Sequence, residues 1–255
     1  MNTPSPQGIS IQVRGLRKSL GGQPVLNGLD FEVRQGEIFV IMGPSGSGKT
    51  VLLKHLIGLL DPDEGEILIE GEPIGQPGVM DRHRMAMVFQ SGALLSSLNV
   101  GDNVGLYLSE HRRKPPAEIA RIVAEKLELV GLKGAEQRMP ADLSGGMRKR
   151  VAIARALVIE PQLIFYDEPT SELDPLIAVT IGEEILRLNR RMQVTSVVVT
   201  HDRELAFGIA DRIALINDGE IVFIGTPAEV KANPHPLLHQ FLTADFNFDT
   251  KRHAP

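Results

Sequence analysis

The chain contains no cysteine and no tryptophan, and only 4% of its 255 residues are aromatic. The absence of cysteine excludes disulfides, thiolate metal sites and a cysteine nucleophile. No apolar run approaches the roughly 20 residues that a membrane-spanning helix needs. The first ten residues also lack the basic and apolar segments of a secretory signal. We therefore expect a cytoplasmic globular protein, long enough to bury a core without covalent cross-links.

The balance of acidic and basic residues bears on whether the protein binds nucleic acid. The chain carries 27 Lys and Arg against 32 Asp and Glu, a formal net charge of −5. Dedicated nucleic-acid binders are usually basic. The composition therefore argues against nucleic acid as a partner.

Short apolar runs alternate with amphipathic segments in a pattern that predicts an α/β fold. Strands are predicted at 9–13, 25–33, 37–42, 65–74 (a hairpin), 85–90, 163–168, 196–200, 212–216 and 220–225. Helices are predicted after residue 50, between Pro116 and Gly131, and at 143–159, 175–191 and 202–210. We expect an α/β core within residues 1–235, a helical subdomain inserted at about 91–158, and a tail at 236–255.

The almost wholly apolar run 37–42 leads directly into GPSGSGKT, which matches the P-loop pattern G-x-x-x-x-G-K-[ST]. Its glycines let successive N–H groups point at phosphate oxygens, and the next helix adds its N-terminal partial positive charge. Lys49 can reach the β- and γ-phosphates, and the Thr50 hydroxyl can bind Mg²⁺. A nucleoside triphosphate is therefore expected at Gly43, Pro44, Ser45, Gly46, Ser47, Gly48, Lys49, Thr50 and Val51.

A second motif places two carboxylates at the end of a predicted strand. Residues 163–166 are apolar or aromatic, and Asp167 and Glu168 follow at the carboxyl end, where α/β sheets bind ligands. Asp167 suits a Mg²⁺ ligand. Glu168 is placed to orient and deprotonate an attacking water.

A third motif, LSGGMRKRVAIARAL at 143–157, lies between Gln90 and Asp167. A P-loop alone would leave kinases, GTPases and helicases open. With this string the chain resembles the ATP-binding-cassette (ABC) ATPases over about residues 9–232. The resemblance implies an α/β P-loop NTPase (RecA-like) core with an antiparallel β subdomain and an inserted all-helical signature subdomain. It also implies ATP and Mg²⁺ as ligands, and ATP hydrolysis coupled to transport.

The resemblance also implies roles for single residues. Gln90 resembles the Q-loop glutamine that contacts Mg²⁺ or the lytic water and reports to a partner subunit. Asp174 lies in SELD, which resembles the D-loop, and His201 resembles the switch histidine at the γ-phosphate. Ser144, Gly145 and Gly146 open a helix and would close on the nucleotide held by a second copy of the chain. Two copies would thus sandwich two ATP molecules head to tail.

Some positions depart from the family pattern or allow two interpretations. Leu20 stands where an adenine-stacking aromatic is usual, and Met147 replaces the signature glutamine. Lys149, Arg150 and Arg155 could form a nucleic-acid patch. Because the chain is acidic overall, we expect these three cations to be solvated or phosphate-neutralising instead.

Three segments narrow the subfamily: FQSGALLSSLNVGDNV at 89–104, the methionine in LSGGMRKR, and ANPHPLLHQFL at 232–242. They resemble the MlaF-type ATPases of Mce-associated transporters, which move phospholipid between bacterial membranes. This resemblance implies a place on the cytoplasmic face of the inner membrane and a multi-span permease that docks near Gln90 to Val100. An Mce-type lipid-binding protein and a small cytoplasmic accessory subunit are further implied partners. DEPTSELDP is the general ABC form, so cassettes for lipoprotein release, amino-acid import and cell division stay open.

Two apolar groups and two other classes of protein stay open at this point. Leu94, Leu95 and Leu98 could form a docking groove or belong to the subdomain core. In the tail, one side of a short helix could pack on its own domain or reach a sister subunit; its residues are Leu237, Leu238, Phe241 and Leu242, with Phe246 and Phe248 beyond. A soluble translation or DNA-repair ABC protein and a catalytically idle module are the rival classes.

Overall fold

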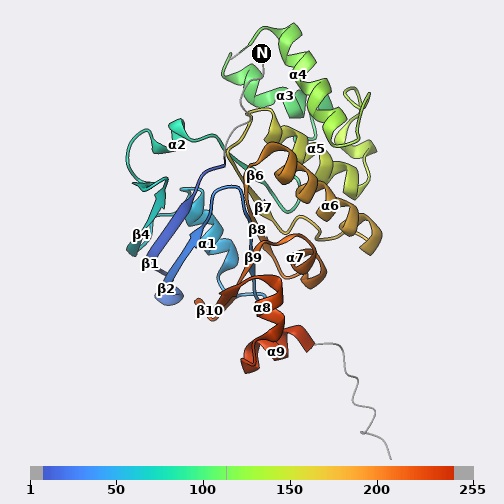
Figure 1. Cartoon of the computed structure of the whole chain (residues 1–255). Coiled ribbons are helices and arrows are strands. Elements are labelled where there is room, and N and C mark those ends of the chain that lie inside the picture. Colours follow the sequence, from blue (N-terminus) through green and yellow to red (C-terminus); the bar gives the residue numbers. More distant parts are fainter. Residues whose placement is uncertain (1–7, 113, 244–255) are drawn as a thin grey trace, which may run out of the picture.

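A computed structural model of the chain describes residues 8–112 and 114–243. These residues form two β-sheets with helices packed around them (Figure 1). The larger sheet contains β3 (Ile38–Met42), β6 (Met85–Val88), β7 (Leu163–Asp167), β8 (Thr195–Thr200), β9 (Arg212–Asn217) and β10 (Glu220–Gly225). The smaller one contains β1 (Ile11–Leu20), β2 (Gln23–Val33), β4 (Glu64–Ile69) and β5 (Glu72–Pro73).

The larger sheet has the order β10-β9-β3-β8-β7-β6. Its strands from β9 to β6 are parallel, and β10 pairs antiparallel with β9. Every residue of β3 is buried, as expected for a strand covered on both faces. Since β3, β8 and β7 are neighbours and parallel, the segments that follow them meet at one edge of the sheet.

The smaller sheet is antiparallel and packs beside α1 (Lys49–Leu56), on the left in Figure 1. The first strand is longer than the predicted 9–13: β1 runs to Leu20 because a bulge between Val13 and Leu16 absorbs Gly15, at φ +56°. The ring of Phe31 in this sheet stacks on Phe39 of β3 at a centroid distance of 5.6 Å. The two sheets therefore share one apolar layer.

Three helices, α3 (Val100–Glu110), α4 (Pro116–Leu129) and α5 (Gly145–Leu157), form a helical part at the top of Figure 1. Asn99 caps α3 by accepting from the Asp102 N–H, 2.8 Å away, and Pro116 opens α4 at a position where proline costs no hydrogen bond. The helices predicted at both α4 and α5 are confirmed. A short 3₁₀ turn, Pro140–Asp142, leads into α5.

The remaining helices cover the core. They are α2 (Val79–Arg82), α6 (Pro175–Met192), α7 (Arg203–Ile209), α8 (Pro227–Ala232) and α9 (Pro236–Thr243). In α9, Leu238 is buried, and Arg203 of α7 donates a hydrogen bond to the Leu242 carbonyl. The described part of the tail thus packs on its own domain, whereas Phe246 and Phe248 lie outside the described residues. No helix in the described ranges is both long and apolar enough to cross a membrane.

Candidate nucleotide site

The loop between β3 and α1 has a backbone that only glycine accommodates at several positions. Gly46 and Gly48 adopt φ values of +84° and +96°. A Cβ at Gly43 would lie 2.2 Å from the carbonyl oxygen of Ile216, and one at Gly48 would lie 2.9 Å from that of Val25. The glycines therefore let the loop curl against neighbouring backbone, as the P-loop prediction requires.

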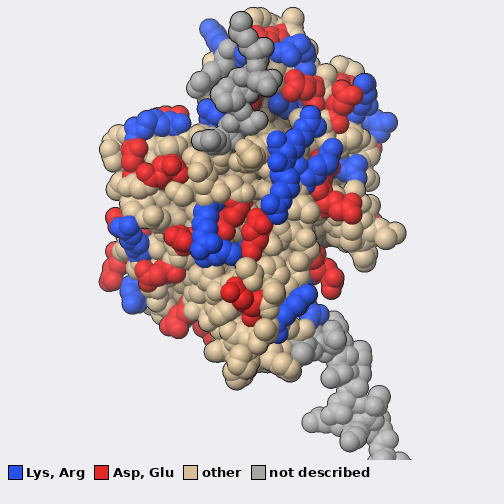
Figure 2. Space-filling model, in the orientation of Figure 1, with Lys and Arg blue, Asp and Glu red and all other residues tan. Residues whose placement is uncertain are grey.

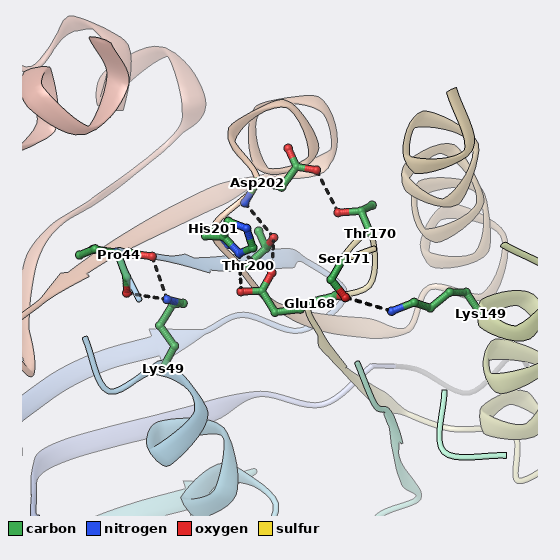
Figure 3. A network of polar contacts seen from close by, with 10 residues as sticks. Pro44, Lys49, Lys149, Glu168, Thr170, Ser171, Thr200, His201 and Asp202 are labelled. Atoms are coloured by element: carbon green, nitrogen blue, oxygen red, sulfur yellow. Dashed lines mark hydrogen bonds and ion pairs between the residues drawn. The ribbon is translucent and has the colours of Figure 1, made fainter. Parts of the chain in front are cut away.

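Lys49 is the first residue of α1, and its side chain folds back against this loop. Its Nζ donates to the carbonyl oxygens of Gly43 and Pro44, both at 2.8 Å (Figure 3). Burial lowers the pKa of Lys49, while the charges of Glu168 and Asp167 act in the opposite direction. These two carbonyls take two of the three ammonium hydrogens, which leaves the third for a phosphate oxygen.

The two carboxylates at the end of β7 differ in their surroundings. Burial raises the pKa of Asp167, and the neighbouring charge of Glu168 raises it further, against Lys149 and Lys49. Glu168 has φ +44°, uncommon for a residue with a side chain, and its N–H donates to the Val199 carbonyl at 2.9 Å.

The Glu168 carboxylate is held by the end of β8. Its Oε1 lies 2.9 Å from Nδ1 of His201, and its Oε2 accepts from the Thr200 hydroxyl at 3.1 Å (Figure 3). The His201 side chain is 61% exposed, so it faces the open side of the site. Thr200 was missed in the sequence; its signal is a polar residue that ends a buried strand next to His201.

The other predicted ligands are distributed over several elements. Thr50 is exposed in the first turn of α1, and Val51 packs partly against the core. Gln90 is exposed in a turn two residues after β6, which ends earlier than predicted. Asp174 caps α6 by accepting from the Ile177 N–H at 3.0 Å. Leu20, at the end of β1, is 43% exposed.

The signature residues open α5 beside the start of α6. Ser144 caps the helix by accepting from the Met147 N–H at 3.3 Å. A Cβ at Gly146 would lie 2.5 Å from Cγ2 of Ile177, so a larger residue would separate the two helices. Within the described residues these groups pack on α6, and their role toward a nucleotide on a second copy stays a prediction.

The expectation that the basic residues of α5 are solvated was wrong for Lys149. Lys149 is only 6% exposed and Arg155 donates to the carbonyls of Gly92 and Ala93, at 2.8 and 2.7 Å. Nε of Arg150 is buried as well. Lys149 and Arg155 therefore hold backbone carbonyls of neighbouring segments. The surface shown in Figure 2 mixes acidic and basic side chains over the core and the helical part.

The oxygen ligands that the site offers fit a Mg²⁺ ion that is held mainly by the phosphates of the nucleotide. No group of three or more His, Asp or Glu among the described residues could hold a metal alone. Mg²⁺ commonly uses one or two protein ligands together with substrate phosphates. The Thr50 hydroxyl and the half-buried Asp167 carboxylate suit that pattern.

Comparisons with known proteins agree with this geometry. The family model described as ABC transporter matches residues 26–171. The chain belongs to the ABC transporter family, as an ATP-binding subunit that hydrolyses ATP. The predicted α/β P-loop NTPase fold is thereby confirmed.

Several relatives are similar to nearly the same extent. The chain is 42% identical over 238 residues to "Intermembrane phospholipid transport system ATP-binding protein MlaF" of Escherichia coli (strain K12), covering 91% of this chain and 88% of the relative. It is 40% identical to "Probable ribonucleotide transport ATP-binding protein mkl" of Mycobacterium leprae (93% and 70% covered). It is 42% identical to "Sulfate/thiosulfate import ATP-binding protein CysA" of Bacillus cereus (92% and 66% covered).

Among solved structures, one similar chain is the ATP-binding cassette MJ0796, described as a dimer in a post-hydrolysis state bound to ADP and Pi. Its TM-score is 0.76 at 31% identity, covering 85% of this chain and 98% of that one.

Proposed function

We propose that this chain is the ATP-hydrolysing motor subunit of a phospholipid transporter at the cytoplasmic face of a bacterial inner membrane. One observation carries the catalytic part of the proposal. Glu168 is held at both carboxylate oxygens, by Thr200 and His201, at the sheet edge that also presents Lys49. A carboxylate so fixed beside a phosphate loop suits a base that acts on a water molecule.

Each residue of the site has one task in this proposal. The P-loop amides and Lys49 bind the phosphates of ATP, and Glu168 orients a water and accepts its proton. His201, on the exposed side, contacts the γ-phosphate and keeps the Glu168 carboxylate in place. Thr50, Asp167 and Gln90 would hold Mg²⁺, which neutralises phosphate charge when bound.

Two copies of the chain complete the site. Ser144, Gly145 and Gly146 form a helix N-terminus that suits a phosphate on the other copy, with Asp174 nearby in the D-loop. The dimeric state of the similar MJ0796 cassette supports this arrangement. Closure on ATP and opening after hydrolysis would then drive a permease.

The permease is proposed to dock near Gln90 to Val100. In and beside this segment Phe89 and Leu95 are exposed, whereas Leu94 packs partly against the core. Of the two interpretations of the leucines, Leu94 thus belongs to the subdomain core and Leu95 to the surface. Exposed apolar side chains next to the nucleotide site suit a helix of a membrane subunit.

Phospholipid is proposed as cargo because the motifs at 89–104 and 143–150 resemble those of MlaF-type ATPases, one of which is 42% identical. An Mce-type lipid-binding protein and a small accessory subunit are the partners proposed with it. Sulfate import, lipoprotein release, amino-acid import and cell division are the alternatives. Purification of the complex from detergent, with mass spectrometry of bound molecules, tests the cargo: co-purified phospholipid is expected, and a permease for a soluble anion would contradict it.

The catalytic part is tested by Glu168→Gln. This variant should keep ATP affinity within about twofold but lose hydrolysis by 10²-fold or more, because removal of a general base costs about 10²–10⁴ in rate. Glu183→Gln, at an exposed position on α6, is the matched control. Wild-type turnover of Glu168→Gln would contradict the proposed role.

A further inference from the structure

Lys149 extends from the signature helix to the catalytic end of β7. Its ammonium donates to the carbonyl of Gln90, to the carbonyl of Glu168 at 3.2 Å and to the Ser171 hydroxyl at 3.3 Å. Figure 3 shows the side chain running from α5 toward Ser171 and Glu168. An ammonium has three hydrogens, so these three acceptors match its full donor capacity.

The Glu168 peptide is fixed on both sides. Its carbonyl also accepts from the Ser171 hydroxyl at 2.9 Å, and its N–H donates to Val199. A non-glycine residue at φ +44° is strained and persists only where its surroundings over-determine it. Lys149 is one of the groups that hold this conformation and thereby the direction of the Glu168 side chain.

The same helix also holds the segment after β6. Lys149 contacts the carbonyl of Gln90, and Arg155 contacts those of Gly92 and Ala93. Lys149 is buried and Arg155 is half-buried, so the contact made by Lys149 is shielded from solvent ions. Residues 90–93 and α5 are therefore tied together at two points, and only Lys149 of these two cations also contacts Glu168.

We propose that Lys149 is a positioning residue for hydrolysis, which sets the Glu168 backbone and transmits displacement of residues 90–93 to it. The inference rests on Glu168 being the base, as proposed above. Lys149 contacts the backbone carbonyl of Glu168, whereas the carboxylate of Glu168 contacts Thr200 and His201. Lys149 therefore acts through the position of Glu168 and not on ATP. A shift of about 1 Å in a reacting group can cost about 10²-fold in rate.

The experiment compares Lys149→Met and Lys149→Gln in the full-length chain. Methionine removes all three N–H donors at similar side-chain length, whereas glutamine retains two N–H hydrogens. Turnover should therefore fall more in Lys149→Met than in Lys149→Gln. We expect kcat to fall 10- to 100-fold in Lys149→Met and less in Lys149→Gln, while KM and the affinity for ATP stay within about twofold. Lys133→Met, at an exposed lysine of the helical part, is the matched control.

The outcomes separate the two proposals. A kcat within twofold of wild type in folded Lys149→Met overturns the positioning role, and so does a loss of kcat in folded protein that is matched by an equal loss of ATP affinity. If Lys149→Met does not fold, Lys149→Gln decides by the same split between kcat and KM. Normal turnover of Glu168→Gln would instead overturn the assignment of the base, whatever the Lys149 variants show.

Discussion

Glu168 Oε1 and His201 Nδ1 lie 2.9 Å apart, although β7 and β8 bring them from positions 33 residues apart in the chain. The adjacent Thr200 holds the other carboxylate oxygen at 3.1 Å. Thr200 and His201, at the end of β8, thus orient the Glu168 carboxylate at the end of the neighbouring strand β7. The parallel pairing of Asp167 with Val199 places them in register.

His201→Ala should lower kcat by at least about tenfold, since the proposed γ-phosphate contact and the side-chain contact to Glu168 Oε1 are lost. Thr200 still holds Oε2, so we expect more residual activity than in Glu168→Gln. Steady-state ATP hydrolysis measures this, with His111→Ala, at an exposed histidine of the helical part, as control. Equal losses in the His201 and His111 variants would show that the contact is not used.

The tail helix α9 contributes to stability through one face. Leu238 is 1% exposed, whereas its neighbour Leu237 is 40% exposed. Leu238→Ala should cost about 2–5 kcal/mol of unfolding free energy, the usual range for a buried leucine, and Leu237→Ala less than about 1 kcal/mol. Urea denaturation compares the two, and similar costs would mean that α9 does not pack as described.

Stability should depend on pH through Glu37. This carboxylate is buried beside Arg212, and burial raises its pKa above the ordinary value near 4.5 in spite of Arg212 and the Arg34 N–H. The folded state then binds the proton more tightly than the unfolded state. Unfolding free energy falls as pH rises from about 4.5 through the raised pKa, by about 1.4 kcal/mol for each unit of elevation.

Glu37→Gln removes this titration. The difference in unfolding free energy, wild type minus variant, should therefore be most favourable to wild type below pH 4.5 and decrease toward neutrality. Urea denaturation at a series of pH values measures it. A difference that stays constant, or that grows with pH, would contradict the raised pKa.

Much of the fold could be predicted because buried strands and glycine-rich loops leave local signals. The run 38–42 is apolar throughout, and the loop after it needs glycine at positions 43, 46 and 48, so both features could be recognised from the local sequence alone. The extension of β1 to Leu20 was not, because the bulge between Val13 and Leu16 interrupts the alternating pattern of the strand.

Residues of the site whose side chains have recognisable chemistry could be predicted from the sequence. Residues whose side chains bind backbone carbonyls were harder to predict. Glu168 and His201 carry recognisable chemistry at strand ends. Lys149 was mistaken for a surface cation, because its partners are the carbonyls of Gln90 and Glu168, and any sequence supplies carbonyls. Only the packing of α5 against the sheet edge shows where that ammonium goes.

The strand order of the larger sheet has a consequence for folding during translation. β3, which carries the P-loop, pairs only with β8 and β9 among the described strands, and these begin more than 150 residues later in the chain. During synthesis, β3 therefore has no neighbouring strand until β8, at Thr195–Thr200, has been made. The α5 helix emerges before β8, so the helical part is complete while the central sheet still lacks its middle strand. ATP binding should thus appear only after β8 and β9 have been translated.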